Sequence, residues 1–142
     1  MRLTRQTNLA IRMLMYCAAN SERLSQVSEI AAAYSVSAMH LAQISKPLVT
    51  AGLLSTVRGR NGGIKLGRPA GEITLADVIQ AVETGIGQAS DKSDRGTESA
   101  EEAEMEKALQ AAFEQFLGSL RCHTIANLVS GMPDIRRLLN VA

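Results

Sequence analysis

The sequence contains no tryptophan, only two cysteines and no long apolar run. Aromatic residues make up 3% of the 142 residues and hydrophobic residues 46%, so the core must be largely aliphatic. Two cysteines cannot form a disulfide framework, and a reducing cytoplasm is the simpler compartment for such a chain. No stretch approaches the roughly 20 apolar residues that a membrane-spanning helix needs. These shortages exclude a disulfide-rich secreted domain and a transmembrane protein.

The start of the chain superficially looks like a secretory signal, because a basic end precedes an apolar stretch. Arg12 interrupts that stretch and leaves only Met13–Ala19 without a charge, which is short for a signal core. We therefore expect no cleaved signal and a cytoplasmic location. The length fits one domain of ordinary size.

Charge is divided unevenly between the two halves, although the net charge is only +1. Residues 1–70 hold nine basic and two acidic residues, a net charge of +7. Residues 71–142 hold six basic and twelve acidic residues, a net charge of −6. The basic half fits a polyanionic partner, whereas the acidic half requires another role.

Apolar residues at spacings of three and four predict three helices in the first third of the chain. They span about Thr4–Ala19, Leu24–Tyr34 and Ser37–Leu54, with Thr4 and Ser37 as caps. Their apolar faces are formed by Leu9, Met13 and Tyr16, by Val27, Ile30 and Ala31, and by Met39, Leu41, Ile44 and Leu48. Helix, tight turn and capped helix form the helix-turn-helix outline.

Pro47 falls inside the third of these helices. An internal proline removes a hydrogen bond and costs about 3 kcal/mol. Because Leu48 and Leu53 continue the apolar pattern, we expect a kink at Pro47 rather than the end of the helix.

After the third predicted helix, apolar residues recur at every second position on either side of a glycine-rich tip. Leu54 and Thr56 precede the tip, and Ile64 and Leu66 follow it, which predicts a two-stranded hairpin. The basic residues on or beside it are Arg58, Arg60, Lys65 and Arg68. A helix-turn-helix followed by a basic hairpin is a winged helix, so we predict a mainly α fold with a two-stranded β wing.

A winged helix presents the start of its capped helix to the major groove and its hairpin to phosphates or the minor groove. We therefore predict that double-stranded DNA is the partner. The predicted contacts are Ser37, Ala38, Met39, His40, Gln43 and Lys46 in the helix, and Arg58, Arg60, Asn61, Gly62, Gly63 and Lys65 in the hairpin. Gln43 suits adenine, and the amides of Gly62 and Gly63 are expected to add donors.

The second half is predicted to begin with a helix capped by Thr74. Its apolar side chains are expected to face the core, and they are Leu75, Val78, Ile79 and Val82. Residues 84–100 lose all periodicity and predict a loop, and a long helix starts at Glu101. Two short elements should close the chain.

We divide the single unit into a winged-helix region (1–83), a loop (84–100) and a dimerisation segment (101–142).

The long helix has a broad apolar stripe opposite its acidic residues, and such a stripe needs a partner surface. Pairing with a second copy is the expected use, because paired winged helices read two half-sites one turn apart. The predicted homodimer contacts are Met105, Leu109, Ala112, Phe113, Phe116, Leu117 and Leu120.

No catalytic constellation accompanies these elements. The two histidines and two cysteines are widely separated, and Arg58–Gly63 lies in a hairpin rather than in a strand-to-helix phosphate loop. We therefore expect that the protein is not an enzyme. A winged helix that binds protein rather than DNA remains an alternative.

Three segments resemble the Rrf family of winged-helix regulators, the group that includes IscR, NsrR and RirA, over essentially the whole chain. They are MRLTRQTNLAIRMLMYCAAN (1–20), TVRGRNGGIKLGRPAGEITLADVIQAVE (56–83) and HTIANLV (123–129). The likeness is greatest to the NsrR and RirA branch. It implies a dimeric repressor or activator whose long helices cross at the dimer interface.

In members that bind an iron–sulfur cluster, three cysteines of the loop and the start of the long helix ligate the cluster, because soft thiolates hold iron and sulfide. The matching positions here fall around Ala89–Lys92, near Thr97 and on Ala103, and none is a cysteine. Asn8 stands where some members supply a carboxylate ligand. We therefore expect no metal site and no cofactor, while a cluster held by non-cysteine ligands remains an alternative.

Either this is a natural member that senses without a cluster or its ligands have been replaced. The thorough rewriting of residues 90–104 favours the first. Cys17 and Cys122 are expected to be small buried residues. The signal is then a small molecule, oxidation of one of these thiols, or a partner protein.

Overall fold

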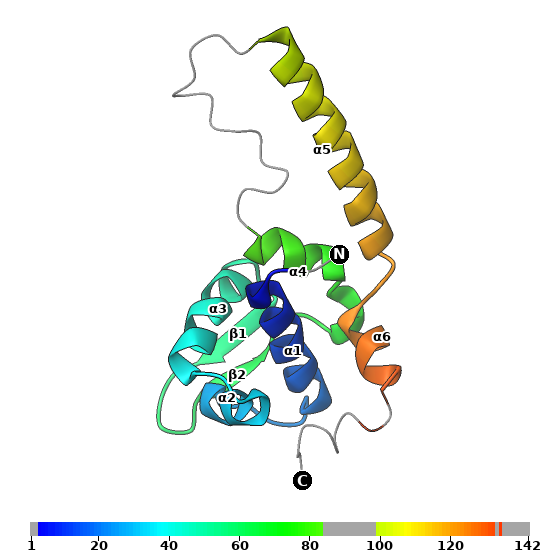
Figure 1. Cartoon of the computed structure of the whole chain (residues 1–142). Coiled ribbons are helices and arrows are strands. Elements are labelled where there is room, and N and C mark those ends of the chain that lie inside the picture. The colour runs from blue at the N-terminus through cyan, green and yellow to red at the C-terminus, as the bar shows by residue number, and fades with distance from the viewer. Residues whose placement is uncertain (1–2, 84–98, 133, 135–142) are drawn as a thin grey trace.

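Helices pack beside a small hairpin in the first half of the molecule (Figure 1). The computed structural model describes residues 3–83, 99–132 and 134. The elements are α1 (Arg5–Ala19), α2 (Val27–Tyr34), α3 (Ala38–Thr50), β1 (Leu54–Val57), β2 (Gly63–Leu66), η1 (Ala70–Glu72), α4 (Leu75–Val82), α5 (Ala100–Leu120) and α6 (Ile125–Ser130). The mainly helical fold with a two-stranded wing is confirmed. Most of the predicted loop 84–100 and the last predicted element lie outside the described residues.

Side-chain caps start the helices where the sequence predicts them. The hydroxyl oxygens of Thr4 and Ser37 accept hydrogen bonds of 3.2 Å from the backbone N–H groups of Thr7 and His40. Thr74 forms a capping box with Asp77. Each cap satisfies a donor that the first helical turn leaves unpaired, so helix starts are fixed locally. Helix α3 continues through Pro47 to Thr50 instead of ending at the proline.

The wing is an antiparallel hairpin in which Leu54 pairs with Leu66 and Val57 pairs with Gly63. A third segment adds to it, because Ser25 and Ile64 exchange two backbone hydrogen bonds of 2.9 and 2.8 Å. This bridge ties the wing to the residues before α2. An isolated bridge has no periodicity, so the sequence gives no sign of it.

Helix α1 runs through the core. Met13, Leu14, Leu41 and Leu48 are all fully buried, which joins α1 to α3. Helix α6 is attached through backbone hydrogen bonds of 2.9 Å, from Leu75 N–H to the His123 carbonyl and from Ile125 N–H to the Ile73 carbonyl. Helix α6 therefore packs with the winged-helix region in one body.

Helix α5 extends away from this body, and only its C-terminal end approaches α4 (Figure 1). There Leu117 packs on Ala76 and Ile79 in a second, smaller apolar cluster. Among the described helices, none is both long and apolar enough to cross a membrane.

Candidate nucleic-acid interface

The start of α3 presents a polar, exposed face. Ser37, Gln43 and Lys46 are exposed and His40 is half-buried. The Lys46 ammonium donates a 3.1 Å hydrogen bond to Oε1 of Gln43, which leaves the Gln43 amide hydrogens to other acceptors. Leu41, Ile44 and Leu48 are buried on the opposite face and fix which side of the helix faces outward. A base edge in a major groove can meet this face directly.

Met39 differs from its predicted place on the apolar face of this helix. Its side chain is 77% exposed, so the buried stripe of α3 starts at Leu41. The spacing of Met39 is compatible with both faces, but Ala38 and Met39 precede the point where α3 meets the core. The exposure agrees with the other role predicted for Met39, as an apolar contact at the start of the reading helix.

The wing carries cations on its exposed positions. Arg58, Arg60, Asn61 and Lys65 are all exposed. Within the described residues, the salt bridges join Arg23 to Glu29, Arg68 to Asp77 and Lys107 to Glu104, so none involves a wing cation. Arg68, which lies beside the wing, is 3.7 Å from the Asp77 carboxylate and is thereby partly neutralised.

Gly62 does not supply the backbone donor predicted for it. It is buried, and its N–H donates a 3.0 Å hydrogen bond to the Gly59 carbonyl within the turn. A Cβ at Gly62 would lie 2.1 Å from the Val57 carbonyl oxygen, and one at Gly63 would lie 2.6 Å from the Ser25 carbonyl oxygen. These glycines therefore allow backbone segments to approach closely, and the turn itself occupies the donor of Gly62.

Gln26 is a supporting residue that the sequence does not identify. Its side-chain amide donates a hydrogen bond to the Gly62 carbonyl, and its backbone N–H donates one of 3.0 Å to Glu29. Together with the Ser25 bridge, this contact fixes the turn of the wing and the start of β2 against the residues that precede α2. No motif marks the pair, because the two partners are 36 positions apart.

The residues predicted to form the dimer interface fall into two groups. Met105 and Leu109 are 61% and 63% exposed, and Ala112 is exposed as well. Phe113, Phe116 and Leu120 are half-buried, and Leu117 is fully buried against α4 of its own chain. Leu117 therefore differs from the prediction, because its packing surface is already occupied. The apolar surface still exposed lies on the distal part of α5.

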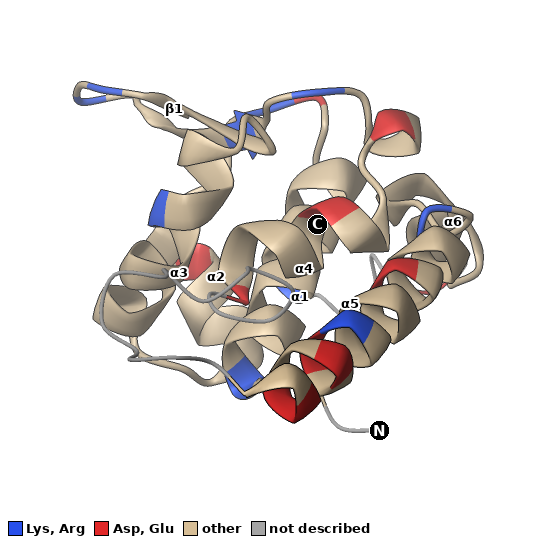
Figure 2. Ribbon diagram, turned by 90° about the horizontal axis from the view of Figure 1, so that it is seen from above, with Lys and Arg blue, Asp and Glu red and all other residues tan. Residues whose placement is uncertain are grey.

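Basic and acidic positions concentrate in different parts of the ribbon (Figure 2). Lys and Arg positions follow the wing and its tip, whereas Asp and Glu positions recur along α5. The uneven charge of the two halves of the sequence thus corresponds to two regions of the structure. A polyanion is attracted to the wing and repelled by α5.

Cys17 is not suited to hold an iron–sulfur cluster. Cys17 is buried in α1, and burial raises the pKa of its thiol to about 12, which opposes the thiolate that iron requires. Cys122 is exposed, so the prediction of a buried residue is correct for Cys17 and wrong for Cys122, which lies just beyond the last turn of α5. The described residues contain no group of three or more His, Cys, Asp or Glu side chains that could hold a metal ion. The side chains of this described part of the chain do not fit the iron–sulfur cluster of related proteins.

Comparison with known proteins places the chain among transcriptional regulators. The family model Rrf2, described as an iron-dependent transcriptional regulator, matches residues 3–131. The protein aau3 of Rhizobium meliloti (strain 1021) is 47% identical over 143 residues, which cover 99% of this chain and 93% of that protein.

Solved structures of regulators share the fold. CymR, the global cysteine regulator of B. subtilis, superposes with a TM-score of 0.67 at 25% identity and covers 92% of this chain and 97% of its own. IscR of T. potens gives a TM-score of 0.68 at 21% identity, over 94% of this chain and 90% of its own, and so shows the fold alone. The family and these neighbours are regulators rather than enzymes. The resemblance found in the sequence is confirmed, and the chain belongs to the Rrf2 family of transcriptional regulators.

Proposed function

We propose that the protein is a sequence-specific DNA-binding transcriptional regulator. The observation that carries the proposal is that one molecule combines an exposed, capped α3 with a wing whose Arg58, Arg60 and Lys65 make no salt bridge among the described residues. Gln43 and Lys46 supply hydrogen-bonding groups for base edges and phosphates, and the wing arginines supply charge for phosphates or the minor groove. Such a protein works with the chromosome in the cytoplasm.

We further propose that the protein acts as a homodimer. Met105 and Leu109 would otherwise remain in water on a helix that touches its own body only near Leu117. Pairing of two α5 helices buries these side chains and places two wings on one duplex, so that each copy reads one half-site.

The proposed regulator is a repressor that operates without an iron–sulfur cluster. A dimer that occupies a promoter blocks it without further machinery. The buried Cys17 thiol and the lack of cysteine at residues 84–104 support a regulator without a cluster. Anaerobic purification followed by iron and sulfide analysis tests this point. A brown protein with stoichiometric iron would instead establish a cluster on non-cysteine ligands.

Fluorescence anisotropy with a duplex from the protein's own promoter tests the DNA-binding proposal. We expect tighter binding than to a shuffled duplex of the same length and composition, by about 1000-fold or more. Transcription from the same promoter in vitro should fall as the protein is added. Equal, weak binding to both duplexes would favour a winged helix that recognises protein.

A further inference from the structure

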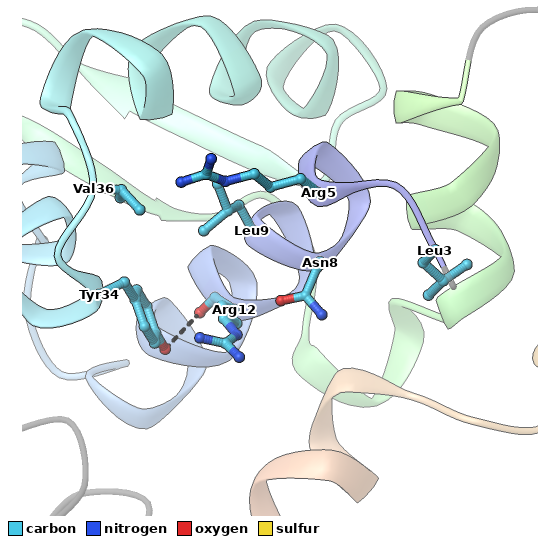
Figure 3. A pocket seen from close by; sticks show the side chains of 7 residues that line it. All are labelled: Leu3, Arg5, Asn8, Leu9, Arg12, Tyr34 and Val36. Atoms are coloured by element: carbon cyan, nitrogen blue, oxygen red, sulfur yellow. Dashed lines mark hydrogen bonds between the residues drawn. The ribbon is translucent and has the colours of Figure 1, made fainter. Parts of the chain in front are cut away.

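An open pocket of about 620 Å³ lies between α1 and the turn that joins α2 to α3 (Figure 3). Its polar lining comes from Arg5, Asn8 and Arg12 on α1. Leu9 lies among them, and Tyr34 and Val36 line the opposite side. The pocket is separate from the wing, and the DNA-binding proposal uses none of these residues.

Two guanidinium groups stand at opposite ends of this pocket, with the Leu9 side chain between them and the Asn8 amide beside Arg12 (Figure 3). Arg5 and Arg12 are seven positions apart on one helix, which corresponds to about 10 Å along its axis. Within the described part of the chain, neither forms a salt bridge with a carboxylate. The recess therefore concentrates positive charge that no described acidic side chain offsets.

Tyr34 holds one end of the pocket in place. The Arg12 guanidinium carbon lies 5.4 Å from the centroid of the Tyr34 ring, and the Tyr34 hydroxyl donates a 3.2 Å hydrogen bond to the Arg12 carbonyl. Burial raises the pKa of Tyr34 to about 12, so the hydroxyl remains a donor at neutral pH. A stacked guanidinium is preorganised, and less side-chain entropy is lost when it binds an anion.

We propose that this pocket binds a small organic anion with an acidic group at each end, one carboxylate or phosphate paired with Arg5 and the other with Arg12. A guanidinium fork pairs bidentately with either group. Asn8 offers both a donor and an acceptor to further polar atoms, and Leu9 and Val36 offer apolar contact to a short carbon chain. An inorganic ion would leave these apolar side chains without a partner.

The position of the pocket gives the ligand a route to the DNA-reading helix. Val36 directly precedes Ser37, the cap of α3, and it follows Ser35, whose left-handed backbone (φ 53°) ends α2. A ligand that contacts Val36 thus touches the turn that sets the start of α3. This regulatory step, unlike the binding itself, rests on the proposed function.

Thermal unfolding of the full chain without DNA tests the binding. The panel contains acetate, succinate, glutarate, citrate and glycerol 3-phosphate, with neutral succinamide and sodium chloride of equal ionic strength as controls. A ligand with a Kd of about 0.1 mM, present at about 10 mM, raises the Tm by roughly 5 to 10 °C. We expect such a rise for at least one organic anion and for neither control. Comparing the rise for the carboxylates with the rise for glycerol 3-phosphate shows whether the pocket prefers a carboxylate or a phosphate.

Variants locate the binding site. Arg5→Gln and Arg12→Gln should each abolish the rise, measured against that variant's own ligand-free Tm, so that altered stability does not confuse the result. Arg121→Gln, an exposed arginine after α5, should retain it. The proposal is overturned if no panel member exceeds the salt control, or if the rise persists in Arg12→Gln.

A separate titration tests the regulatory step. The anion that gives the largest rise should change the affinity for the own-promoter duplex by fivefold or more, and only when Arg12 is present. Unchanged DNA affinity would overturn the link to α3 and leave the binding site standing. Loss of DNA affinity in the ligand-free Arg5→Gln and Arg12→Gln variants, with no anion-dependent rise in Tm, would assign these arginines to the DNA backbone instead.

Discussion

Glu83 fastens the end of α4 to the start of α1. Its carboxylate accepts hydrogen bonds of 2.5 Å from the hydroxyls of Thr4 and Thr7. These bonds hold the pKa of Glu83 below its ordinary value of 4.5. The charged form is therefore favoured by folding, and it joins residues that are 76 and 79 positions apart.

The pH dependence of stability follows from this lowered pKa. The stabilisation by Glu83 is complete above its unfolded pKa and is lost as the pH falls through the folded pKa. Glu83→Gln should lower the free energy of unfolding by about 1 kcal/mol near pH 7, and the difference from wild type should shrink towards pH 3.5. Urea unfolding at both pH values measures it, with the exposed Glu72→Gln as control. An equal deficit at both pH values would contradict the role of the charge.

Gly62 gives a second test at the residue scale. An added Cβ would meet the Val57 carbonyl oxygen at 2.1 Å, whereas one at Gly71 meets nothing within 4 Å. Gly62→Ala should cost about 1–3 kcal/mol of stability, because the wing turn must shift to make room. Gly71→Ala should change stability by less than about 0.5 kcal/mol. Comparison of the two Tm values is sufficient, and equal values would rule out the close approach in the wing.

At the scale of elements, the wing should supply part of the DNA affinity through charge. Arg60→Ala removes one cation from each copy in the proposed dimer, so binding to the own-promoter duplex should weaken about tenfold and the salt slope should become shallower by about 2. Anisotropy titrations at several salt concentrations measure both quantities. Arg121→Ala serves as the control and should leave both unchanged. An unaltered affinity in Arg60→Ala would argue against the wing as a DNA contact.

Helix α5 should depend on a second copy. A 21-residue helix held only at its C-terminal end has little tertiary packing to stabilise the rest of it, and its exposed Met105 and Leu109 gain by burial. Leu109→Glu should therefore convert the dimer to a monomer in sedimentation at micromolar concentration. Glu104→Gln, a neutralising change on the same helix, should keep the dimer mass. Dimers that persist in Leu109→Glu would show that pairing uses another surface.

The elements could be predicted because their signals are local. Thr4, Ser37 and Thr74 act on the backbone within three residues, and the hairpin has its alternation and its glycines. Long-range contacts left no such signal. The Ser25 bridge to the wing and the hydrogen bonds of Glu83 join distant residues, and the exposure of Met39 depends on where α3 meets the core.

The candidate site could be predicted in its side chains but less well in its backbone. Gln43, Arg58 and Arg60 are exposed at the places their spacing predicts. The backbone N–H of Gly62 already donates a hydrogen bond within the wing. This bond depends on the conformation of the turn, which the sequence does not specify. The pocket between Arg5 and Arg12 also escapes sequence reasoning, because its other wall comes from Tyr34 and Val36.

At the scale of the whole molecule, charge separation joins these features. The half with a net charge of +7 carries α3 and the wing, and the half with −6 carries α5, where Asp and Glu recur (Figure 2). A neutral total thus combines a surface that attracts a polyanion with a helix that is repelled by one. In the proposed homodimer, the distal apolar surface of α5 faces another copy of the chain rather than DNA.

The salt dependence of binding tests this account most directly. With about six phosphate contacts per dimer, a plot of log K against log salt concentration for the own-promoter duplex should fall with a slope of roughly −5. Anisotropy titrations between low and physiological salt give this slope. Tight binding with a slope near −5 would support recognition through the basic half. Binding that is absent or independent of salt would contradict it.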